Sequence, residues 1–487
     1  MDRVLAIALA VAAAGCSSSA PKEVFGDAAV LSAVSTDQKW LALLTNATHL
    51  ATGGHVGTLA VVPAGGGAPV TLDDRSSGGV FNRGTTLWYL GGVTVVSEGT
   101  PAVDHVYGAL YVWTPSLGAP IKVGDVVRDY SVSQDGTTAL FMDWATASDD
   151  AANTGTLVAV HAPSCAAGAC SPVVFDHGVT ATQTAWRVAA DGKYVLATVR
   201  GATATDAGKV LLGQMESGQV QLLSSGVDAR AAMMSPDGAS VAWVEGANEV
   251  HSAPTAGGAP TVLTATSPIV DSAAMIDAAS FIVKARENPT GPPALVRLSS
   301  AGQSPTLVPK GQQLFVSQAL PGVTDRWLFF ALATVATSGA PDLWVLDLAT
   351  PGAQPVALAA AVDTPIGQAV AFSDDGSAIE FFDNFDPVTR RGDQYLAPIA
   401  MPARTLVATG VHNAAFIPGT TRLLYIAAPD PDTGAGVLTE LESPTALPEV
   451  QGVGVVNFAN PRQGPAHTWF TQHTGAPDDG VWVMPQP

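Results

Sequence analysis

The sequence predicts an all-β protein, a β-propeller of four-stranded antiparallel blades, from three observations. An apolar strand, an Asp- and Gly-rich turn and a second apolar strand recur along the chain. Successive turns lie 40 to 56 residues apart, which gives about ten units. Each unit also contains a later strand pair around a Gly-containing turn. Four strands in about 45 residues is the pattern of a propeller blade.

The Asp-Gly turn is clearest in four units. In Ser235-Pro236-Asp237-Gly238, the proline sets φ at the first corner, the Asp accepts local backbone hydrogen bonds and the Gly takes the left-handed position. The four segments are VSQDGTTALFMDW (132–144), VAADGKYVLATV (188–199), MSPDGASVAWVE (234–245) and FSDDGSAIEFFD (372–383).

The later strand pair is illustrated by LAVVPAGGGAPVTL (59–72) and LWVLDLATPGAQPVAL (343–358). Proline is tolerated in its second strand if that strand forms the outer edge of a blade. The strands YVLATV (194–199) and ASVAWV (239–244) are almost continuously apolar, as expected for strands that neighbouring blades cover on both faces. We expect most of the ten Trp residues to pack between blades.

The S-x-D-G turn before an apolar strand, followed by the hairpin L-W-V-L-D-x-x-x-x-G-x-x-P-x-x-L, resembles the repeat of TolB-type propellers. The resemblance is strong in four units, partial in the others, and covers nearly the whole chain. It implies eight to ten blades in one ring, with two propellers as the alternative. The last unit has only three strands, so we expect residues around Glu23, Val24 and Phe25 to supply its fourth.

The first sixteen residues predict export. Val4 to Ala14 form an apolar run of signal-peptide length, too short to span a bilayer. The following Gly15-Cys16-Ser17 resembles the lipobox of bacterial lipoproteins, although Ala13 stands where Leu is usual. The resemblance implies a signal peptide over 1–15, diacylation of Cys16, a lipidated tether over 16–22 and the propeller over 23–487. Ser17 favours the outer membrane, with the protein facing the periplasm or the cell surface. The alternative is an ordinary secretory signal with a chance cysteine.

The two remaining cysteines, Cys165 and Cys170, lie between apolar runs with Gly168 between them. In an oxidising compartment we expect a disulfide between them. The alternative, half of a metal site, lacks a second Cys or His pair nearby.

The composition is that of an acidic globular chain. It has 42 acidic and 22 basic residues, a net charge of −20 and 47% hydrophobic residues. This charge argues against binding to nucleic acid or to anionic membranes. We therefore expect the lipid to be the sole membrane contact, and the protein to be monomeric.

Catalytic motifs are missing from the sequence. It has no G-x-S-x-G elbow, no HExxH and no P-loop, and its nine His residues are scattered. Asp430-x-Asp432-x-Gly434 resembles the start of a calcium loop, but no Glu follows at the required spacing. We otherwise expect no cofactor.

The connections between the second and third strands of each unit are long, and we expect them all on one face of the ring. Such loops on a rigid ring are where propellers usually bind ligands, although polar loops can also simply be solvated. They cover 45–57, 91–108, 145–155, 200–208, 383–393, 429–436 and 471–480. Their candidate binding residues are His49, His55, His105, Asp149, Asp150, Asp206, Asp383, Asp386, Arg390, Arg391, Asp393, His473 and Asp478.

Three functions follow as hypotheses. The first is a lipid-anchored, non-catalytic envelope propeller that binds a protein or glycan or acts as a scaffold. The alternative is a glycan-binding or lyase-type propeller enzyme with acidic residues converging on the central channel. A third possibility is a surface spacer. Close carboxylates and His side chains in the channel would favour the enzyme.

Overall fold

The computed structural model describes the chain from Lys22 to Pro485 with internal gaps. The described ranges are 22–25, 29–50, 55–82, 84–98, 103–148, 153–165, 169–201, 206–226, 228–235, 237–286, 293–307, 312–321, 327–334, 342–347, 350, 353–359, 370–373, 377–386, 391–398, 404–411, 413–417, 420–430, 435–443, 446–459, 467–472 and 480–485. Within them, no helix has the length and apolar character needed to cross a membrane. Helical structure there consists of two short 3-10 turns, η2 (Ala162–Ser164) and η3 (Ala181–Gln183).

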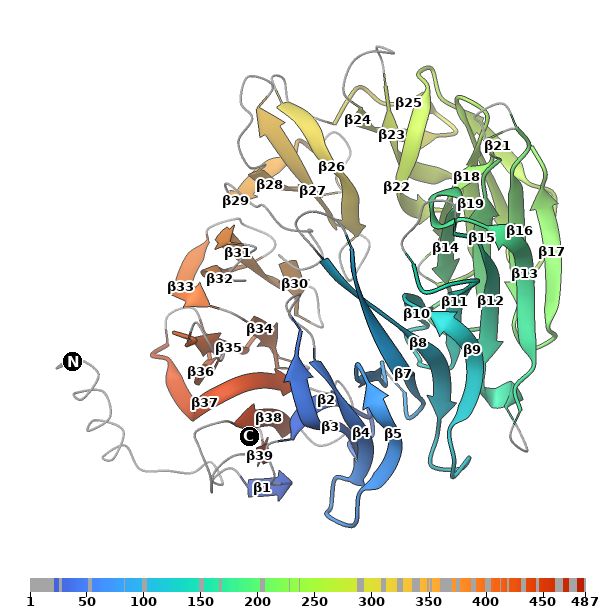
Figure 1. Cartoon of the computed structure of the whole chain (residues 1–487). Helices are drawn as coiled ribbons and strands as arrows, with labels where there is room; N and C mark the ends of the chain where they lie inside the picture. Colours follow the sequence, from blue (N-terminus) through green and yellow to red (C-terminus); the bar gives the residue numbers. More distant parts are fainter. Residues whose placement is uncertain are drawn as a thin grey trace.

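Most of the fold is a series of four-stranded antiparallel sheets, each made of consecutive strands (Figure 1). Units 1 to 4 are β2 (Val30–Val34), β3 (Trp40–His49), β4 (His55–Pro63), β5 (Val70–Ser76); β6 (Gly79–Val80), β7 (Leu87–Glu98), β8 (Val103–Trp113), β9 (Ile121–Val127); β10 (Tyr130–Val132), β11 (Thr138–Trp144), β12 (Gly155–His161), β13 (Pro172–Val179); and β14 (Thr184–Val188), β15 (Tyr194–Val199), β16 (Lys209–Gln214), β17 (Gln219–Ser224). Units 5 to 8 are β18 (Arg230–Met234), β19 (Ser240–Glu245), β20 (Glu249–Pro254), β21 (Thr261–Thr264); β22 (Ile269–Asp277), β23 (Ser280–Ala285), β24 (Ala294–Ser299), β25 (Gly302–Gln303); β26 (Gln312–Pro321), β27 (Trp327–Thr334), β28 (Asp342–Asp347), β29 (Val356–Ala359); and β30 (Val370–Phe372), β31 (Ala378–Asp386), β32 (Arg391–Pro398), β33 (Thr405–Val411).

The last sheet contains two units that share a strand. Its order is β1-β39-β38-β37-β36-β35-β34. The first half of β37 pairs with β36 and its second half pairs with β38, so β37 ends unit 9 and begins unit 10. The strands are β34 (Asn413–Phe416), β35 (Leu423–Ala427), β36 (Gly436–Leu441), β37 (Glu449–Ala459), β38 (His467–Gln472), β39 (Gly480–Pro485) and β1 (Lys22–Phe25). The described strands thus form ten blades.

The N-terminal strand completes the last unit. β1 pairs antiparallel with β39, and Glu23 lies opposite Trp482. Unit 1 also packs on unit 10, because the buried backbone N–H of Leu31 donates to Oγ1 of Thr471 at 2.9 Å. Val481 of β39 belongs to the same apolar cluster as Leu31. The predicted N-terminal closing strand is therefore confirmed, and the units follow one another around one centre (Figure 1).

The S-x-D-G turns have the geometry that their chemistry predicts. In unit 3, Oγ of Ser133 donates to Asp135 at 2.6 Å and accepts the backbone N–H of Thr138 at 2.9 Å. Gly136 has a φ of 77°, the left-handed region that a residue without Cβ adopts easily. The Ser–Asp bond recurs in units 1 and 5. The turn of unit 3 is therefore closed by bonds among its own residues, and Asn82 of the preceding unit adds a hydrogen bond to the backbone oxygen of Ser133 at 2.6 Å.

Apolar layers between blades form the core. Trp88 of unit 2 is fully buried in a cluster with Ala139 and Phe141 of unit 3. Its indole Nε1 donates to the backbone oxygen of Gly136 at 2.8 Å, so the buried indole N–H also has a hydrogen-bond acceptor. Trp243 of unit 5 is likewise buried, together with Leu196 of unit 4. For these two residues the prediction of packing between blades is confirmed.

Three of the expected long loops are largely strand, which corrects the sequence-based prediction. The second strand bulges at Asn46, Gly92 and Asn384, where φ is 51°, 57° and 51°. A left-handed bulge residue turns the strand, and pairing then resumes. Within 45–57, 91–108 and 383–393, the two strands thus run on as paired hairpins beyond the bulge.

Candidate functional site

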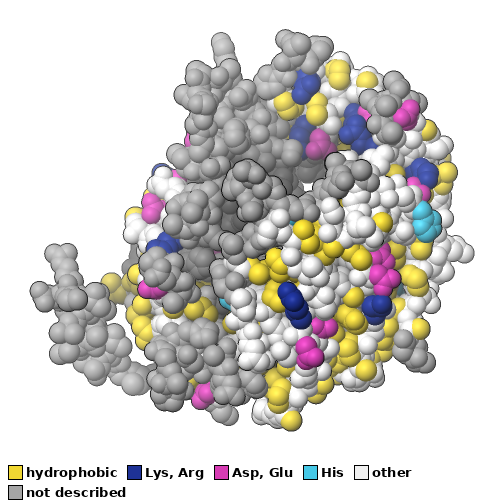
Figure 2. All heavy atoms as spheres, in the orientation of Figure 1, with side chains coloured by type: hydrophobic (Ala, Val, Ile, Leu, Met, Phe, Trp, Pro, Cys, Tyr) yellow, Lys and Arg dark blue, Asp and Glu magenta, His cyan; other side chains and the backbone are white. Residues whose placement is uncertain are grey.

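A cleft lies beside the connection between units 2 and 3, and the described part of the face in Figure 2 carries apolar side chains with single charged groups among them. One part of the cleft, of about 520 Å³, is lined by Ser77, Leu90, His105, Val106, Arg128, Asp129 and Tyr130. An adjoining part of about 440 Å³ shares the last three residues and adds Val80, Asn82 and Val132. The walls combine the apolar side chains of Leu90, Val106, Val80 and Val132 with polar and charged groups, a mixture found in many binding sites.

The charged edge of the cleft comes from the two-residue connection between β9 and β10. Nε of Arg128 lies 2.6 Å from Oδ2 of Asp129, and their side chains are 28% and 70% exposed. Both charges are therefore accessible to a ligand. Tyr130, the next residue, donates its hydroxyl to the backbone oxygen of Trp88 at 3.2 Å. Burial raises the pKa of Tyr130 far above its ordinary value, so the phenol stays neutral.

The opposite wall comes from the β7–β8 hairpin, which extends toward the middle of the ring (Figure 1). His105 and Val106 of β8 lie opposite Val96 and Val95 of β7. Val106 and Tyr130 pack against one apolar cluster, which also includes Val56 of β4. The wall is thus held by neighbouring elements on two sides, and the cleft is largely preformed.

Of the predicted binding residues, His105 lies in this cleft. His49 and His55 are paired across the β3–β4 hairpin near its tip. Asp206 lies just before β16. Asp386 and Arg391 are register partners on β31 and β32, as are Asp383 and Asp393. The structure thus divides the described candidates among units 1, 2, 4 and 8.

Asp383 is a structural residue in this arrangement. Its side chain is 6% exposed, and Oδ2 accepts a hydrogen bond from Nη1 of Arg404 at 2.7 Å. Oδ1 accepts the backbone N–H of Asn384 at 2.9 Å, while Nδ2 of Asn384 donates to Asp393 at 3.1 Å. Arg404 also donates to the backbone oxygen of Leu358 in unit 7. These contacts stabilise the bulge of β31 and join two blades.

Several predicted residues lie outside the described residues: Cys16, Asp149, Asp150, Arg390, Asp432, His473 and Asp478. Asp430 is described, and its backbone N–H donates to the oxygen of Ala435 at 2.7 Å. Within the described ranges, no three His, Cys, Asp or Glu side chains are grouped closely enough to hold a metal ion.

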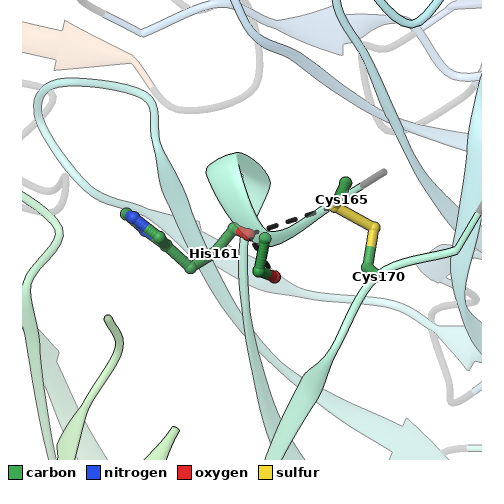
Figure 3. Close-up of a disulfide and its surroundings, with 4 residues drawn as sticks. His161, Cys165 and Cys170 are labelled. Atoms are coloured by element: carbon green, nitrogen blue, oxygen red, sulfur yellow. Dashed lines mark hydrogen bonds between the residues drawn. A yellow bond between two sulfur atoms is a disulfide. The ribbon is translucent and has the colours of Figure 1, made fainter. Parts of the chain in front are cut away.

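The structure contains the disulfide between Cys165 and Cys170 (Figure 3). It spans the connection from β12 to β13, directly after η2. The backbone oxygen of His161 accepts a hydrogen bond from Oγ of Ser164 at 2.7 Å. The disulfide therefore holds the start of β13, the outer strand of unit 3. Neither cysteine lines the cleft.

Sequence reasoning missed Arg128, Asp129 and Tyr130. The sequence feature that could have identified them is the segment VVRDYSV (126–132), in which two adjacent opposite charges interrupt an apolar stretch between two units. Connections between units leave the ring on the same face as those between second and third strands. The predicted binding residues all lie in connections of the second kind, whereas Arg128 and Asp129 lie in one of the first.

No protein-family model and no curated protein matches this sequence. Solved structures resemble the fold. A eukaryotic initiation factor is 12% identical, with a TM-score of 0.45, over 78% of this chain and 88% of the other. A prolyl endopeptidase is 13% identical, with a TM-score of 0.39, over 74% of this chain and 53% of the other. The β-propeller domain of the Trilobed protease from Pyrococcus furiosus is 9% identical, with a TM-score of 0.37, over 67% and 93%.

Proposed function

We propose that this protein is a lipid-anchored envelope protein whose propeller binds a protein partner without catalysing a reaction. The observation that carries the proposal is the preformed cleft between units 2 and 3. An accessible Arg128–Asp129 pair stands there beside the apolar side chains of Val80, Leu90 and Val106. Apolar contact area with a few oriented charges is typical of protein recognition sites.

The chemistry of the cleft suggests what the partner presents. Apolar walls take an apolar side chain, and Arg128 and Asp129 pair with charges of both signs beside it. Because the walls belong to paired strands, little of the propeller has to become ordered when the partner binds, and the entropy cost of binding is small. We therefore favour an exposed segment of another envelope protein as the partner, in which an apolar residue is flanked by charges.

The position of β1 supports the role of the lipid. β1 begins at Lys22, six residues after Cys16 (22 − 16 = 6). Six extended residues span at most about 20 Å. A lipid on Cys16 would therefore hold unit 10 close to the membrane surface.

Affinity capture from envelope extracts tests the proposal. The bait is the full mature chain, compared with Arg128→Gln and with the matched control Lys122→Gln. Lys122 lies on β9 of the same unit, its side chain is 53% exposed, and it also forms an ion pair, with Asp125. We expect a specific protein to be recovered by the wild type and by Lys122→Gln, and to be depleted at least about tenfold by Arg128→Gln. Recovery of no specific protein, or equal recovery by all three baits, contradicts the proposal.

A further inference from the structure

The first strand of unit 3 carries backbone groups that point away from its own sheet. β10 is the edge strand of that sheet and lies nearer to the middle of the ring than β11 to β13 (Figure 1). The backbone N–H of Ser133, the residue after β10, donates to the oxygen of Thr138 on β11 at 2.8 Å. Because bonded and non-bonded residues alternate in an antiparallel pair, Ser131 also bonds to β11, whereas Tyr130 and Val132 direct their N–H and C=O groups away from it.

In units 2 and 4, side chains occupy the corresponding edge groups. Oγ of Ser32 accepts the backbone N–H of Gly79 on β6 at 2.9 Å. Nη1 of Arg187 donates to the backbone oxygen of Trp186 on β14 at 2.8 Å. The inner edges of these two units are thus partly closed by the protein itself.

The edge of β10 is more open. Nδ2 of Asn82 donates to the backbone oxygen of Val132 at 3.2 Å. The described residues provide no acceptor for the N–H of Val132 and no partner for the backbone N–H and C=O of Tyr130. An open strand edge is a template for pairing with another extended chain.

The side chains beside this edge line the cleft between units 2 and 3. Tyr130 and Val132 lie two residues apart, so both project from the same face of β10. The hydroxyl of Tyr130 donates to the backbone oxygen of Trp88, which shows that this face is turned toward unit 2. Val80 of β6 lines the same part of the cleft, and it is 43% exposed. The open edge and the apolar surface therefore belong to one site.

We propose that the segment bound in the cleft is an extended strand that pairs with β10 and becomes a fifth strand of unit 3. This inference rests on the proposed function and specifies the form of the partner. A helix uses its own N–H and C=O groups, so only an extended backbone can satisfy the edge of β10. Segment residues opposite Tyr130 and Val132 share their face and lie beside Val80, so they are apolar.

The charges next to β10 select the end of the bound segment. The side chain of Asp129 is 70% exposed, whereas that of Arg128, 2.6 Å away, is 28% exposed. The more accessible charge is therefore the carboxylate. A Lys or Arg of the segment pairs with Asp129, and the net charge of −20 favours the approach of such a partner. The expected pattern is apolar-x-apolar with a Lys or Arg at one end.

A phage-displayed library of random peptides, selected with the full mature chain as bait, supplies the probe. Fluorescence anisotropy then measures the selected peptide on the wild type, Val132→Pro, Val132→Ala and Val188→Pro. Val132→Pro removes the outward N–H and leaves the bonds to β11 in place. Val188 is the matched control in unit 4, because the N–H of Ala189 donates to the oxygen of Tyr194 at 2.9 Å as Ser133 does in unit 3. Val188 does not line the cleft.

We expect Val132→Pro to weaken peptide binding at least about fivefold, Val132→Ala to weaken it less, and Val188→Pro to leave it unchanged. Amide hydrogen exchange of the wild type gives a readout that needs no variant. The amides of Tyr130 and Val132 should gain protection when the peptide binds, whereas those of 184–188 should not. Wild-type binding by Val132→Pro, an equal loss in Val132→Ala, no gain in protection, or a library that yields no peptide overturns the proposal.

Arg128→Gln separates this inference from the proposed function. Weaker peptide binding by Arg128→Gln, together with wild-type binding by Val132→Pro, would mean that the cleft binds a segment without strand pairing. The proposed function would then stand and the extended strand would not. A library that yields no peptide, together with a capture experiment that recovers no specific protein, would contradict both.

Discussion

Gln394 of β32 donates its side-chain amide to the carboxyl group of Glu380 on β31, and both residues are buried inside unit 8. Burial raises the pKa of Glu380 from 4.5 to about 8, although the hydrogen bond from Gln394 opposes the shift. At neutral pH the carboxyl group is therefore mostly protonated. A neutral acid beside an amide is far less costly to bury than an unpaired carboxylate.

This pair predicts a loss of stability on the alkaline side. The folded state holds the proton more tightly than the unfolded state, so the contribution to stability is complete below about pH 4.5 and is lost as the pH rises through about 8. Between pH 5 and 8.5 we expect the free energy of unfolding to fall by on the order of 3 kcal/mol. Glu380→Gln, which cannot ionise, should remove that part of the pH dependence. Chemical denaturation of the wild type and of Glu380→Gln at pH 5 and 8.5 measures this loss of stability. An equal loss in both proteins would refute the raised pKa of Glu380 as its cause.

Loss of the closing strand should destabilise the ring. A chain without residues 20–28 lacks β1, so the edge of β39 is left unpaired. We expect its Tm to fall by roughly 5 °C or more. The control lacks only residues 16–19, which precede the strand, and should melt like the full mature chain. Unchanged melting of the first variant would show that β1 contributes little.

Trp88 should be one of the most sensitive positions of the core. Trp88→Ala removes a fully buried ring and leaves the oxygen of Gly136 without its indole donor. We expect a loss of about 3 to 5 kcal/mol in the free energy of unfolding. Trp186→Ala is the comparison, since that ring is only partly buried, and its cost should be smaller. The midpoints of urea denaturation give both values, and an equal cost would contradict the burial argument.

The disulfide should have a modest effect, because it closes a short loop. Cys165 and Cys170 are five residues apart, and a loop of this size corresponds to about 2 kcal/mol. The double variant Cys165→Ser, Cys170→Ser should lose that amount and should no longer respond to reductant. Wild-type protein treated with dithiothreitol should approach the variant. A reductant effect that persists in the variant would have another origin.

The proposed lipidation of Cys16 is tested by the compartment in which a variant is found. Cys16→Ala should move the protein from the membrane fraction to the soluble fraction of cells, because two acyl chains are needed for stable anchoring. Cys165→Ser, Cys170→Ser serves as the control and should remain in the membrane fraction. Immunoblots of fractionated cells distinguish these outcomes, and membrane retention of Cys16→Ala would argue against the lipobox.

Features that depend on neighbouring residues were predictable from the sequence. The S-x-D-G turns are closed by bonds within six residues, as in Ser133 to Thr138, so their pattern alone specifies the hairpin. Strand β1 was predictable because the last unit has only three strands of its own at the end of the sequence and needs a fourth. The paired extensions beyond Asn46 and Gly92 were not predicted, because polar and Gly-rich segments usually form loops. In the structure, a bulge at each of these residues lets strand pairing resume beyond it.

The candidate site was less predictable, because distant residues decide which side chains are accessible. Asp383 has the loop context of a binding residue, yet it is buried by Arg404, which lies 21 residues further along the chain. Arg128 and Asp129 were overlooked, although they line the cleft, because they lie in a short connection between two units and not in one of the long connections between second and third strands. His105 was identified from its loop position alone.

The pairing of Glu23 with Trp482 also imposes an order on biosynthesis. Strand β1 must wait for strand β39, whose partner residue is synthesised 459 residues later (482 − 23 = 459). Until then unit 10 lacks its outer strand, and an unpaired edge invites aggregation. The ring is therefore completed only after β39 has been synthesised. The contact that completes it joins residues far apart in the sequence, and such contacts are intrinsically slow to form. The lipid proposed on Cys16 would keep this unpaired strand close to the membrane surface while it waits.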